Sequence, residues 1–300
     1  MKIFDCFQFF DESMMLDLRL NILNEYVHKF IIVENTFMHS GKRKKIIFDI
    51  KNFSKFKDKI TYILIDELPS GLYKTDNIQD PVEKGNRIID NTLKIEHNQR
   101  NSILKGLQSA EENDLVIVSD VDEIPNLKDI NLGKIDKKLI HFKQKMYYYK
   151  FNLKYSSKPW FGPKACLKKN LISPQWLRDT KERKYPLWRL DIFFSKMKYN
   201  SIYHVENGGW HFVNIKTPEE IEKKLKNFGH HAEYHESGLK LDDIKKMVND
   251  KRAIYDYHTD MKSSKWSGKE KLQKCDISEL PQYILDNKEK YARWLDKLSI

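Results

Sequence analysis

The chain has 300 residues with 40% hydrophobic content, enough for one large domain with a buried core, and no apolar run approaches the ~20 residues of a membrane helix. Its net charge of +11 comes from lysines spread among acids, which is typical of a solvated surface, although a phosphate-carrying partner would fit it too. The cysteines are few, odd in number and scattered, so we expect no disulfide framework and a cytoplasmic protein with neither signal peptide nor transmembrane segment: Cys6, Cys166 and Cys275.

The first 125 residues alternate strand and helix patterns. Short apolar or β-branched runs predict four strands, at 1–10, 29–35, 57–66 and 115–120. Apolar residues at helical spacing predict a helix at 12–26 and one or two helices within 87–114. This alternation predicts an α/β fold with a doubly wound, mostly parallel sheet and helices on both faces.

The pattern is less regular after Pro125. Residues 139–155 are aromatic and strand-like, whereas 156–169 and 173–190 mix proline, tryptophan and basic residues and predict loops. Residues 201–215 predict a strand interrupted by two glycines. Thr217 and the proline after it predict a helix start within 217–231, and the tail predicts a further helix at 276–298. We find no repeat or linker and expect one domain over 1–300.

Residues 114–125, DLVIVSDVDEIP, join an apolar strand to an acidic end. Asp120 and Asp122 are two residues apart, a spacing that points both side chains to one side in extended backbone. Ligands bind beyond the carboxyl ends of the strands in an open parallel sheet. Two carboxylates there repel each other unless a cation lies between them, and oxygen ligands suit Mg²⁺ or Mn²⁺ that also contacts a substrate phosphate. The alternative is an exposed acidic turn that Pro125 ends.

Three segments together resemble glycosyltransferase family 17: DLVIVSDVDEIP, IVENTFMHSGKRKK, and GGWHF followed by TPEEI. The resemblance runs from Phe4 to the C-terminal region. It implies a GT-A fold in which 1–125 bind a nucleotide sugar and 126–300 form an irregular acceptor-side half. It also implies transfer of a sugar with inversion onto a glycan hydroxyl, with Mn²⁺ or Mg²⁺ and, as in the family's known type, UDP-N-acetylglucosamine as donor. Animal members carry an N-terminal membrane anchor that we do not find, so the acceptor stays open.

The resemblance also assigns roles to single residues. Asp120 and Asp122 fall on the family's D-x-D motif as metal ligands, and Glu123 belongs to the same motif. Glu34 ends the second strand and is a candidate contact to the nucleoside; the alternative is an ordinary strand-end charge. Arg100 is a candidate contact to donor phosphate or to Asp120, or else a surface arginine. Weaker candidates follow Glu34: His39, Ser40 and Lys42.

The motif GGWHF offers a second set of ligand contacts. Its glycines permit close approach of backbone to a ligand, Trp210 offers a stacking face for a sugar, and His211 is a candidate ligand of the metal or contact to the diphosphate. The alternative is a core tryptophan beside a hydrogen-bonded histidine. The nearby GHHAEYH lacks the glutamate of the zinc-protease pattern, so we expect it at the rim of the site: His230, His231 and His235.

The proposed chemistry needs a carboxylate that takes the proton of the acceptor hydroxyl. The sequence does not select one, and the candidates are Glu123, Asp191, Glu206 and Glu233. Two other classes of protein stay open. A basic nucleic-acid-binding protein would fit the charge, but no Lys/Arg cluster or nucleic-acid-binding motif is present, so we expect no nucleic-acid partner. A metal-dependent phosphohydrolase could use the same aspartates, although the early strands supply few further acids.

Overall fold

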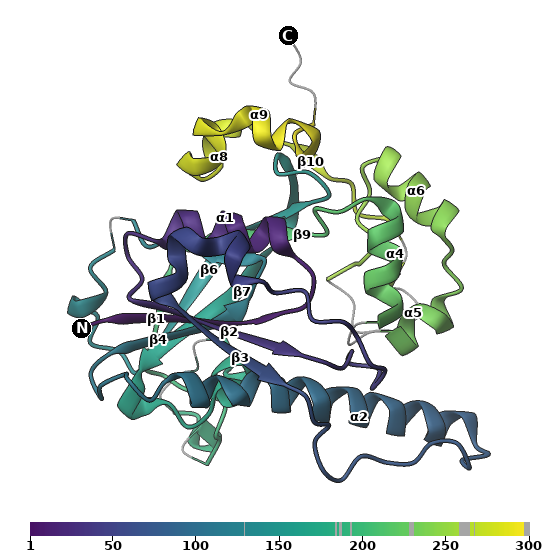
Figure 1. The fold of residues 1–300 in the computed structure, drawn as a ribbon, viewed down its shortest axis with the longest axis horizontal. Helices are drawn as coiled ribbons and strands as arrows, with labels where there is room; N and C mark the ends of the chain where they lie inside the picture. The colour runs from purple at the N-terminus through teal and green to yellow at the C-terminus, as the bar shows by residue number, and fades with distance from the viewer. Residues whose placement is uncertain are drawn as a thin grey trace.

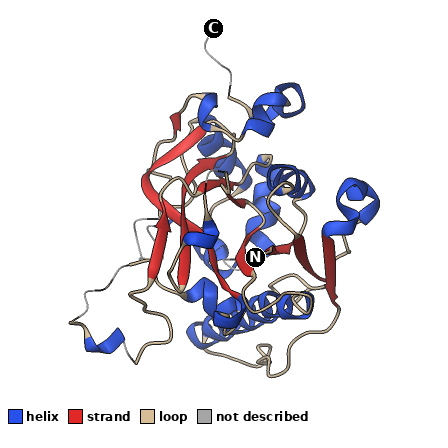
Figure 2. Cartoon of the chain, turned by 90° about the vertical axis from the view of Figure 1, so that its left-hand side faces the viewer, coloured by secondary structure: helices blue, strands red, loops and turns tan. Residues whose placement is uncertain are grey.

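One mixed sheet of ten strands runs through the part of the chain that the structure, a computed structural model, describes: residues 1–128, 130–183, 185, 188–192, 194–227, 231–257, 265–266 and 268–296. The strands follow the order β3-β2-β1-β4-β7-β6-β9-β5, with β10 paired to β7 and β8 paired to β6. Strands from both halves of the chain therefore join one sheet. Figure 2 shows these strands running through the molecule between helices.

The first half of the chain contributes four parallel strands, at the predicted places. They are β1 (Ile3–Phe9), β2 (Lys29–Asn35), β3 (Ile60–Ile65) and β4 (Leu115–Asp120). β1 lies between β2 and β4, so that Cys6 is paired with Ile31 on one side and with Val118 on the other. All three residues are buried, because both faces of this part of the sheet are covered.

Helices cover the two faces of the sheet, which confirms the expected α/β class (Figure 1). On one face, α1 (Ser13–Leu23) packs leucines and methionines against β1, β2 and β4. On the other face lie α2 (Pro81–Asn101), the 3₁₀ helix η2 (Ser102–Gly106) and α3 (Pro174–Asp179). Further 3₁₀ helices are η1 (Ile50–Lys59), η3 (Leu132–Lys134), η4 (Lys168–Asn170) and η5 (Leu190–Ile192).

The chain from Glu123 onward contributes six more strands: β5 (Glu123–Pro125), β6 (Leu139–Tyr148), β7 (Leu153–Leu167), β8 (Ile202–Val205), β9 (Gly209–Val213) and β10 (Gln273–Lys274). The prediction of a loop at 156–169 was therefore wrong, because β7 covers most of it. Its prolines, Pro159 and Pro163, fall within the two register shifts of the β6–β7 pairing, where a missing N–H costs no regular ladder bond. The predicted interruption at 201–215 is confirmed, since β8 and β9 pair with successive parts of β6.

The C-terminal part is helical but broken. α4 (Pro218–Asn227) begins as predicted: the Glu220 N–H donates to Thr217 Oγ1 and the Thr217 N–H donates to the Glu220 carboxylate. α5 (His231–Ser237) and α6 (Leu241–Asn249) follow. The single helix expected at 276–298 was wrong, because Pro281 and the non-helical Asn287 divide it into η6 (Ile277–Glu279), α8 (Gln282–Asp286), α9 (Lys288–Tyr291) and η7 (Ala292–Trp294).

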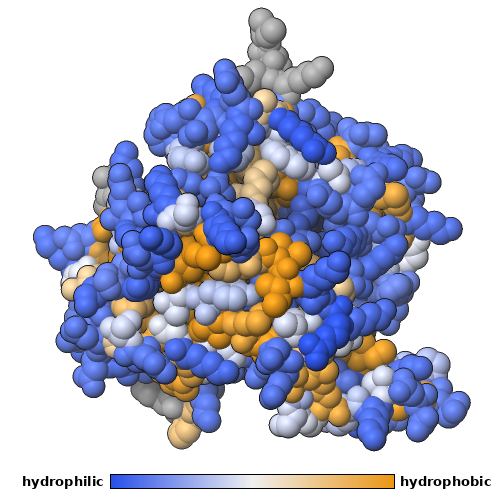
Figure 3. Space-filling view, in the orientation of Figure 1, coloured by the Kyte–Doolittle hydropathy of each residue, from blue (hydrophilic) through white to orange (hydrophobic). Residues whose placement is uncertain are grey.

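The surface is mostly hydrophilic on the face that Figure 3 shows, but apolar side chains gather where the edge strand β3 lies. None of the helices in the described ranges combines the length and the apolar composition that crossing a bilayer requires. All three cysteines are free, as expected.

Candidate functional site

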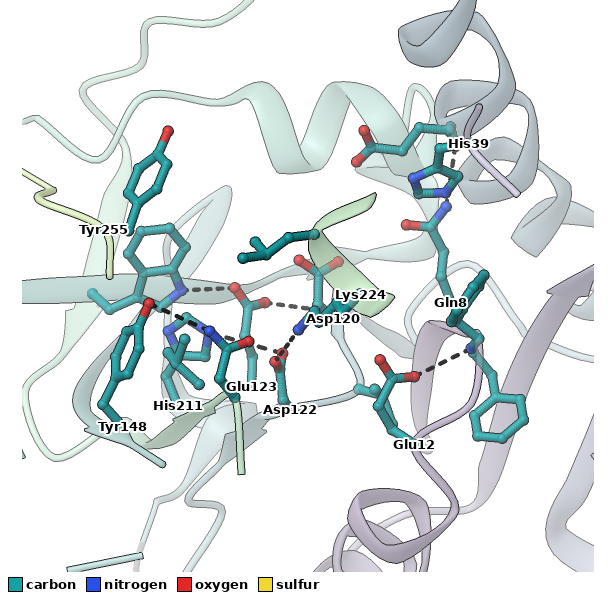
Figure 4. A pocket seen from close by; sticks show the side chains of 18 of the residues that line it. Gln8, Glu12, His39, Asp120, Asp122, Glu123, Tyr148, His211, Lys224 and Tyr255 are labelled. Carbon is teal, nitrogen blue, oxygen red and sulfur yellow. Dashed lines mark hydrogen bonds and ion pairs between the residues drawn. The ribbon is translucent and has the colours of Figure 1, made fainter. Parts of the chain in front are cut away.

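A cavity of about 300 Å³ opens at the carboxyl ends of β1 and β4 (Figure 4), where an open parallel sheet binds its ligands. The β1–α1 connection, α2 and the β4–β5 turn form one side. β9, α4 and residues near 255 form the other. Its lining residues are Gln8, Phe9, Phe10, Glu12, His39, Glu96, Gln99, Arg100, Asp120, Val121, Asp122, Glu123, Tyr148, Trp160, His211, Val213, Asn214, Lys224, Leu225, Ile254, Tyr255, Tyr257 and Trp266.

Asp120, the last residue of β4, is held between two arginines. Arg100 of α2 lies 3.3 Å from its Oδ1, and Arg178 of α3 lies 3.1 Å from its Oδ2. Burial alone would raise the pKa of Asp120, but Arg178 and Arg100 outweigh burial and lower it. Asp120 is therefore ionised and already neutralised by protein cations.

Asp122 has a different environment on the same turn. Its Oδ1 lies 3.8 Å from His211 Nε2 and its Oδ2 lies 3.8 Å from Lys224 Nζ, both too long for hydrogen bonds. Burial raises the pKa of Asp122, opposed by Lys224 and His211. Figure 4 shows His211 and Lys224 on the cavity side of this carboxylate. Among the described residues, Asp122 thus has no short bond to a cationic side chain, whereas Asp120 has two.

Glu123 is fully buried and accepts four hydrogen bonds. The donors are Trp160 Nε1 at 2.7 Å, Arg178 Nη1 and Nη2 at 2.8 and 3.1 Å, and the Asp120 N–H at 2.8 Å. A Cβ at Gly162 would lie 2.6 Å from the Glu123 carboxyl carbon, so glycine makes room for this arrangement. Each carboxylate oxygen of Glu123 therefore accepts two hydrogen bonds from the protein, and these bonds stabilise the turn. This arrangement does not favour Glu123 as the group that takes a proton from an acceptor.

Two arginines that sequence reasoning missed hold the turn, one partly buried (Arg178) and one fully buried (Arg19). Arg178 bridges Asp120 and Glu123, and the segment around it carried no signal because it predicted a loop. Arg19 of α1 lies beneath the turn and donates to the carbonyl oxygens of Asp120, Val121 and Glu123 at 2.9, 3.3 and 2.9 Å. Its signal was a charged residue between two leucines, Leu18 and Leu20, of an amphipathic helix pattern.

Trp210 and His211 of GGWHF lie on opposite sides of β9, because side chains alternate along a strand. His211 faces the cavity and stacks on Trp160, with ring centroids 4.9 Å apart, and its Nδ1 is buried without a hydrogen bond. Trp210 is not a lining residue, since its Nε1 donates to the Glu279 carbonyl at 2.7 Å. Other aromatic residues line the cavity instead, among them Trp160, Tyr255, Tyr257 and Trp266.

Of the candidates on β2 and in the loop after it, only His39 lines the cavity. Glu34 is buried outside the cavity lining and accepts from Tyr62 Oη at 2.9 Å, from Lys44 Nζ and from the N–H groups of Ile47 and Phe48. It ties the loop after β2 to the sheet. His39 from the same loop does line the cavity, and burial lowers the pKa of its imidazole. Ser40 and Lys42 do not line it.

The remaining acids proposed for proton transfer lie outside the cavity lining. Asp191 pairs with Arg189 at 2.8 Å and with Lys198 at 2.7 Å, and all three side chains are partly exposed. Glu206 pairs with Lys143 at 2.7 Å on the surface. Glu233 lies on α5 with His231 and His235, and none of the three lines the cavity; His230 lies outside the described residues.

Among the residues that the structure describes, no group of three or more His, Cys, Asp or Glu side chains converges as a ready metal site. Asp122 and His211 are two candidate ligands that lie side by side at the cavity, with Asp122 Oδ1 3.8 Å from His211 Nε2. Two protein ligands suit Mg²⁺ or Mn²⁺ when substrate oxygens complete the coordination. The residues present therefore fit a cation that arrives with a phosphorylated ligand.

Comparison with known proteins identifies one family. The family model of glycosyltransferase family 17 matches residues 1–296. No curated protein matches the chain. Two crystal structures of HddC from Yersinia pseudotuberculosis, one complexed with GMP-PN, are 13% and 12% identical, cover 68% of this chain and 90% of that chain, and have TM-scores of 0.31 and 0.28. That likeness is too weak to bear on the fold.

Proposed function

Because the chain belongs to glycosyltransferase family 17, we propose that it transfers the sugar of a nucleoside diphosphate sugar onto a glycan hydroxyl, with inversion at the anomeric carbon. We assign its sheet to the GT-A type, its donor to UDP-N-acetylglucosamine and its cofactor to Mn²⁺ or Mg²⁺. The observation that carries this proposal is the pair formed by Asp122 and His211 at the cavity. Asp122 Oδ1 and His211 Nε2 lie 3.8 Å apart, too far for a hydrogen bond, although both side chains are largely buried. The other ring nitrogen of His211, Nδ1, is buried without a hydrogen bond.

In this proposal the charged residues at the cavity have different roles. Asp122 and His211 hold the cation, which when bound neutralises charge on the diphosphate. Lys224 approaches the same place from α4 and offers a second positive charge to the departing nucleoside diphosphate. Asp120 does not need to bind the cation, because Arg100 and Arg178 already neutralise it; its role is to fix the turn.

Aromatic side chains make the rest of the cavity suitable for a sugar or a base. Trp160, Tyr255, Tyr257 and Trp266 offer apolar faces, while Asn214 and Gln8 offer amide groups beside them. A pocket with aromatic walls and a few polar groups suits a ligand that combines rings with hydroxyls.

The test is Asp122→Asn, which keeps the size of the side chain and removes its charge. We expect turnover of UDP-N-acetylglucosamine to fall about 100-fold or more. Mn²⁺ with UDP should stabilise the wild type in thermal unfolding, by about 2.7 kcal/mol at 100 times Kd, and should not stabilise the variant. Without ligands the variant should be as stable as the wild type, since one member of a group of close carboxylates loses its charge.

Asp136→Asn is the matched control, because Asp136 is exposed and lies outside the cavity lining. It should behave like the wild type in both measurements. An Asp122→Asn protein that gains as much stability from Mn²⁺ and UDP as the wild type would remove the chief residue of the proposal. Release of sugar 1-phosphate or inorganic phosphate, in place of transfer, would favour a phosphohydrolase.

A further inference from the structure

A second cavity, of about 280 Å³, adjoins the first one. The start of α1, the residues after β9, α4 and Trp294 form its walls. Four residues line both cavities: Glu12, Asp122, Asn214 and Lys224. The two cavities therefore meet at the place where the first one holds its candidate cation ligand.

Most acids of the first cavity are already matched by arginine. Glu96 lies 2.7 Å from Arg100, Asp120 lies between Arg100 and Arg178, and Glu123 binds Arg178. Among the described residues, only two carboxylates that line the first cavity form no ion pair with an arginine: Asp122 and Glu12. Both stand at the junction of the cavities, so two carboxylates are available there for two different tasks.

Glu12 is fixed in place by the backbone. Its Oε2 accepts from the N–H groups of both Phe10 and Asp11, at 3.3 and 3.1 Å. Glu12 has no cationic partner within 4 Å among the described residues. Lys216 binds Asp11 at 2.6 Å, and although burial lowers the pKa of Lys216, the nearby Glu12 and Asp11 outweigh burial and raise it. Figure 4 shows Glu12 entering the cavity from the side opposite His211, with Asp122 between them.

On the basis of the proposed function, we propose that the second cavity binds the acceptor sugar and that Glu12 takes the proton of its attacking hydroxyl. Asp122 serves the cation, which leaves Glu12 as the carboxylate between donor and acceptor. Trp294 offers an aromatic face for the acceptor ring, and Asp11, Asn214 and Glu220 offer oxygens and an amide for its other hydroxyls.

The step balances without a further reactant. The acceptor oxygen forms a bond to the anomeric carbon of the donor sugar. The bond from that carbon to the diphosphate oxygen breaks, and its electron pair leaves with the nucleoside diphosphate. The acceptor proton passes to the Glu12 carboxylate and from there to water. When water occupies the second cavity, the same step releases free sugar, which gives an assay that needs no known acceptor.

The test compares Glu12→Gln with the wild type. Glutamine keeps an oxygen that accepts the Phe10 and Asp11 N–H groups but cannot take a proton. We expect release of free sugar from the best substrate in a panel of UDP-sugars to fall about 100- to 10,000-fold, with unchanged stabilisation by Mn²⁺ and UDP. Glu25→Gln, exposed just beyond α1, is the matched control.

A second measurement addresses the cavity itself. In saturation-transfer NMR with UDP and Mg²⁺ present, at least one methyl glycoside of a panel should bind the wild type, and Trp294→Ala should weaken that binding at least 10-fold. Glu12→Gln with a normal rate, or no glycoside bound by a protein that binds UDP, would overturn this inference and leave the proposed function standing. A wild type that neither binds UDP nor cleaves any UDP-sugar would instead overturn the proposed function, and this inference with it.

Discussion

At the scale of single residues, the acidic turn depends on a buried cation beneath it. The Arg19 guanidinium is fully buried and donates to both oxygens of Asp5, at 2.8 and 2.6 Å, and to Ser119 Oγ at 2.5 Å. Its remaining N–H groups reach the three carbonyls of the turn. Arg19 therefore ties α1, β1 and the β4–β5 turn together, and only a planar guanidinium has the donors to do so.

We expect Arg19→Met to destabilise the protein by about 3–5 kcal/mol, because it leaves the Asp5 carboxylate buried without its partner. Urea-induced unfolding measures this change. The control is Arg87→Met on α2, which breaks partly exposed contacts with Glu83, Asp90 and the Tyr73 ring and should change the stability by less than about 1 kcal/mol. Equal stabilities of the two variants would show that the buried pair contributes little.

At the scale of secondary structure, the short pairing of β5 with β9 sets the distance between the turn and its histidine. Glu123 is opposite His211 in this pairing, and Pro125 is opposite Gly209. Gly209 has φ +114°, and a Cβ on it would lie 2.2 Å from the Ile124 carbonyl oxygen and 2.6 Å from the Asn126 nitrogen. These neighbours are backbone atoms, which cannot move aside without shifting β5.

Gly209→Ala should therefore destabilise the protein by about 2 kcal/mol or more and abolish stabilisation by Mn²⁺ and UDP, since His211 and Asp122 would move apart. Gly85→Ala is the contrasting change. Gly85 lies inside α2 with no atom within 4 Å of an added Cβ, so alanine should stabilise the helix by about 0.5–1 kcal/mol. Thermal unfolding of both variants checks the opposite signs.

At the scale of the whole molecule, the net charge of +11 is spread over the surface. Many lysines lie in ion pairs with acids of distant segments, such as Lys145 with Glu279 and Lys290 with Asp17. Lysines that are paired with acids in this way do not form the continuous basic surface that binds nucleic acid. The charge is better explained as a solvated surface around one acidic cavity whose acids are mostly matched by arginine.

We accordingly expect weak binding to random duplex DNA that disappears by physiological salt, because scattered lysines contact few phosphates at once. Fluorescence anisotropy with a labelled duplex at increasing salt measures this. Submicromolar affinity that persists at physiological salt would contradict the explanation and revive the nucleic-acid alternative.

The sequence by itself determined the features that depend on neighbours along the chain. The four parallel strands follow from short apolar runs, and the start of α4 follows from Thr217, Pro218 and Glu220, because burial pattern and capping are local properties. The acidic strand end at Asp120 and Asp122 was equally visible, since a sheet places such residues at its carboxyl edge. β7 was not visible, because its prolines are tolerated only through register shifts set by β6.

Only the tertiary structure decided what each acid can do. In the sequence Asp120, Asp122 and Glu123 look alike, but Arg178 from α3 and Arg100 from α2 neutralise the first and Arg178 and Trp160 occupy the last. Glu12 looked like the start of a helix until the fold put it at the junction of two cavities. The electrostatic environment of a carboxylate depends on partners far away in the chain, and hydrophobic periodicity carries no information about them.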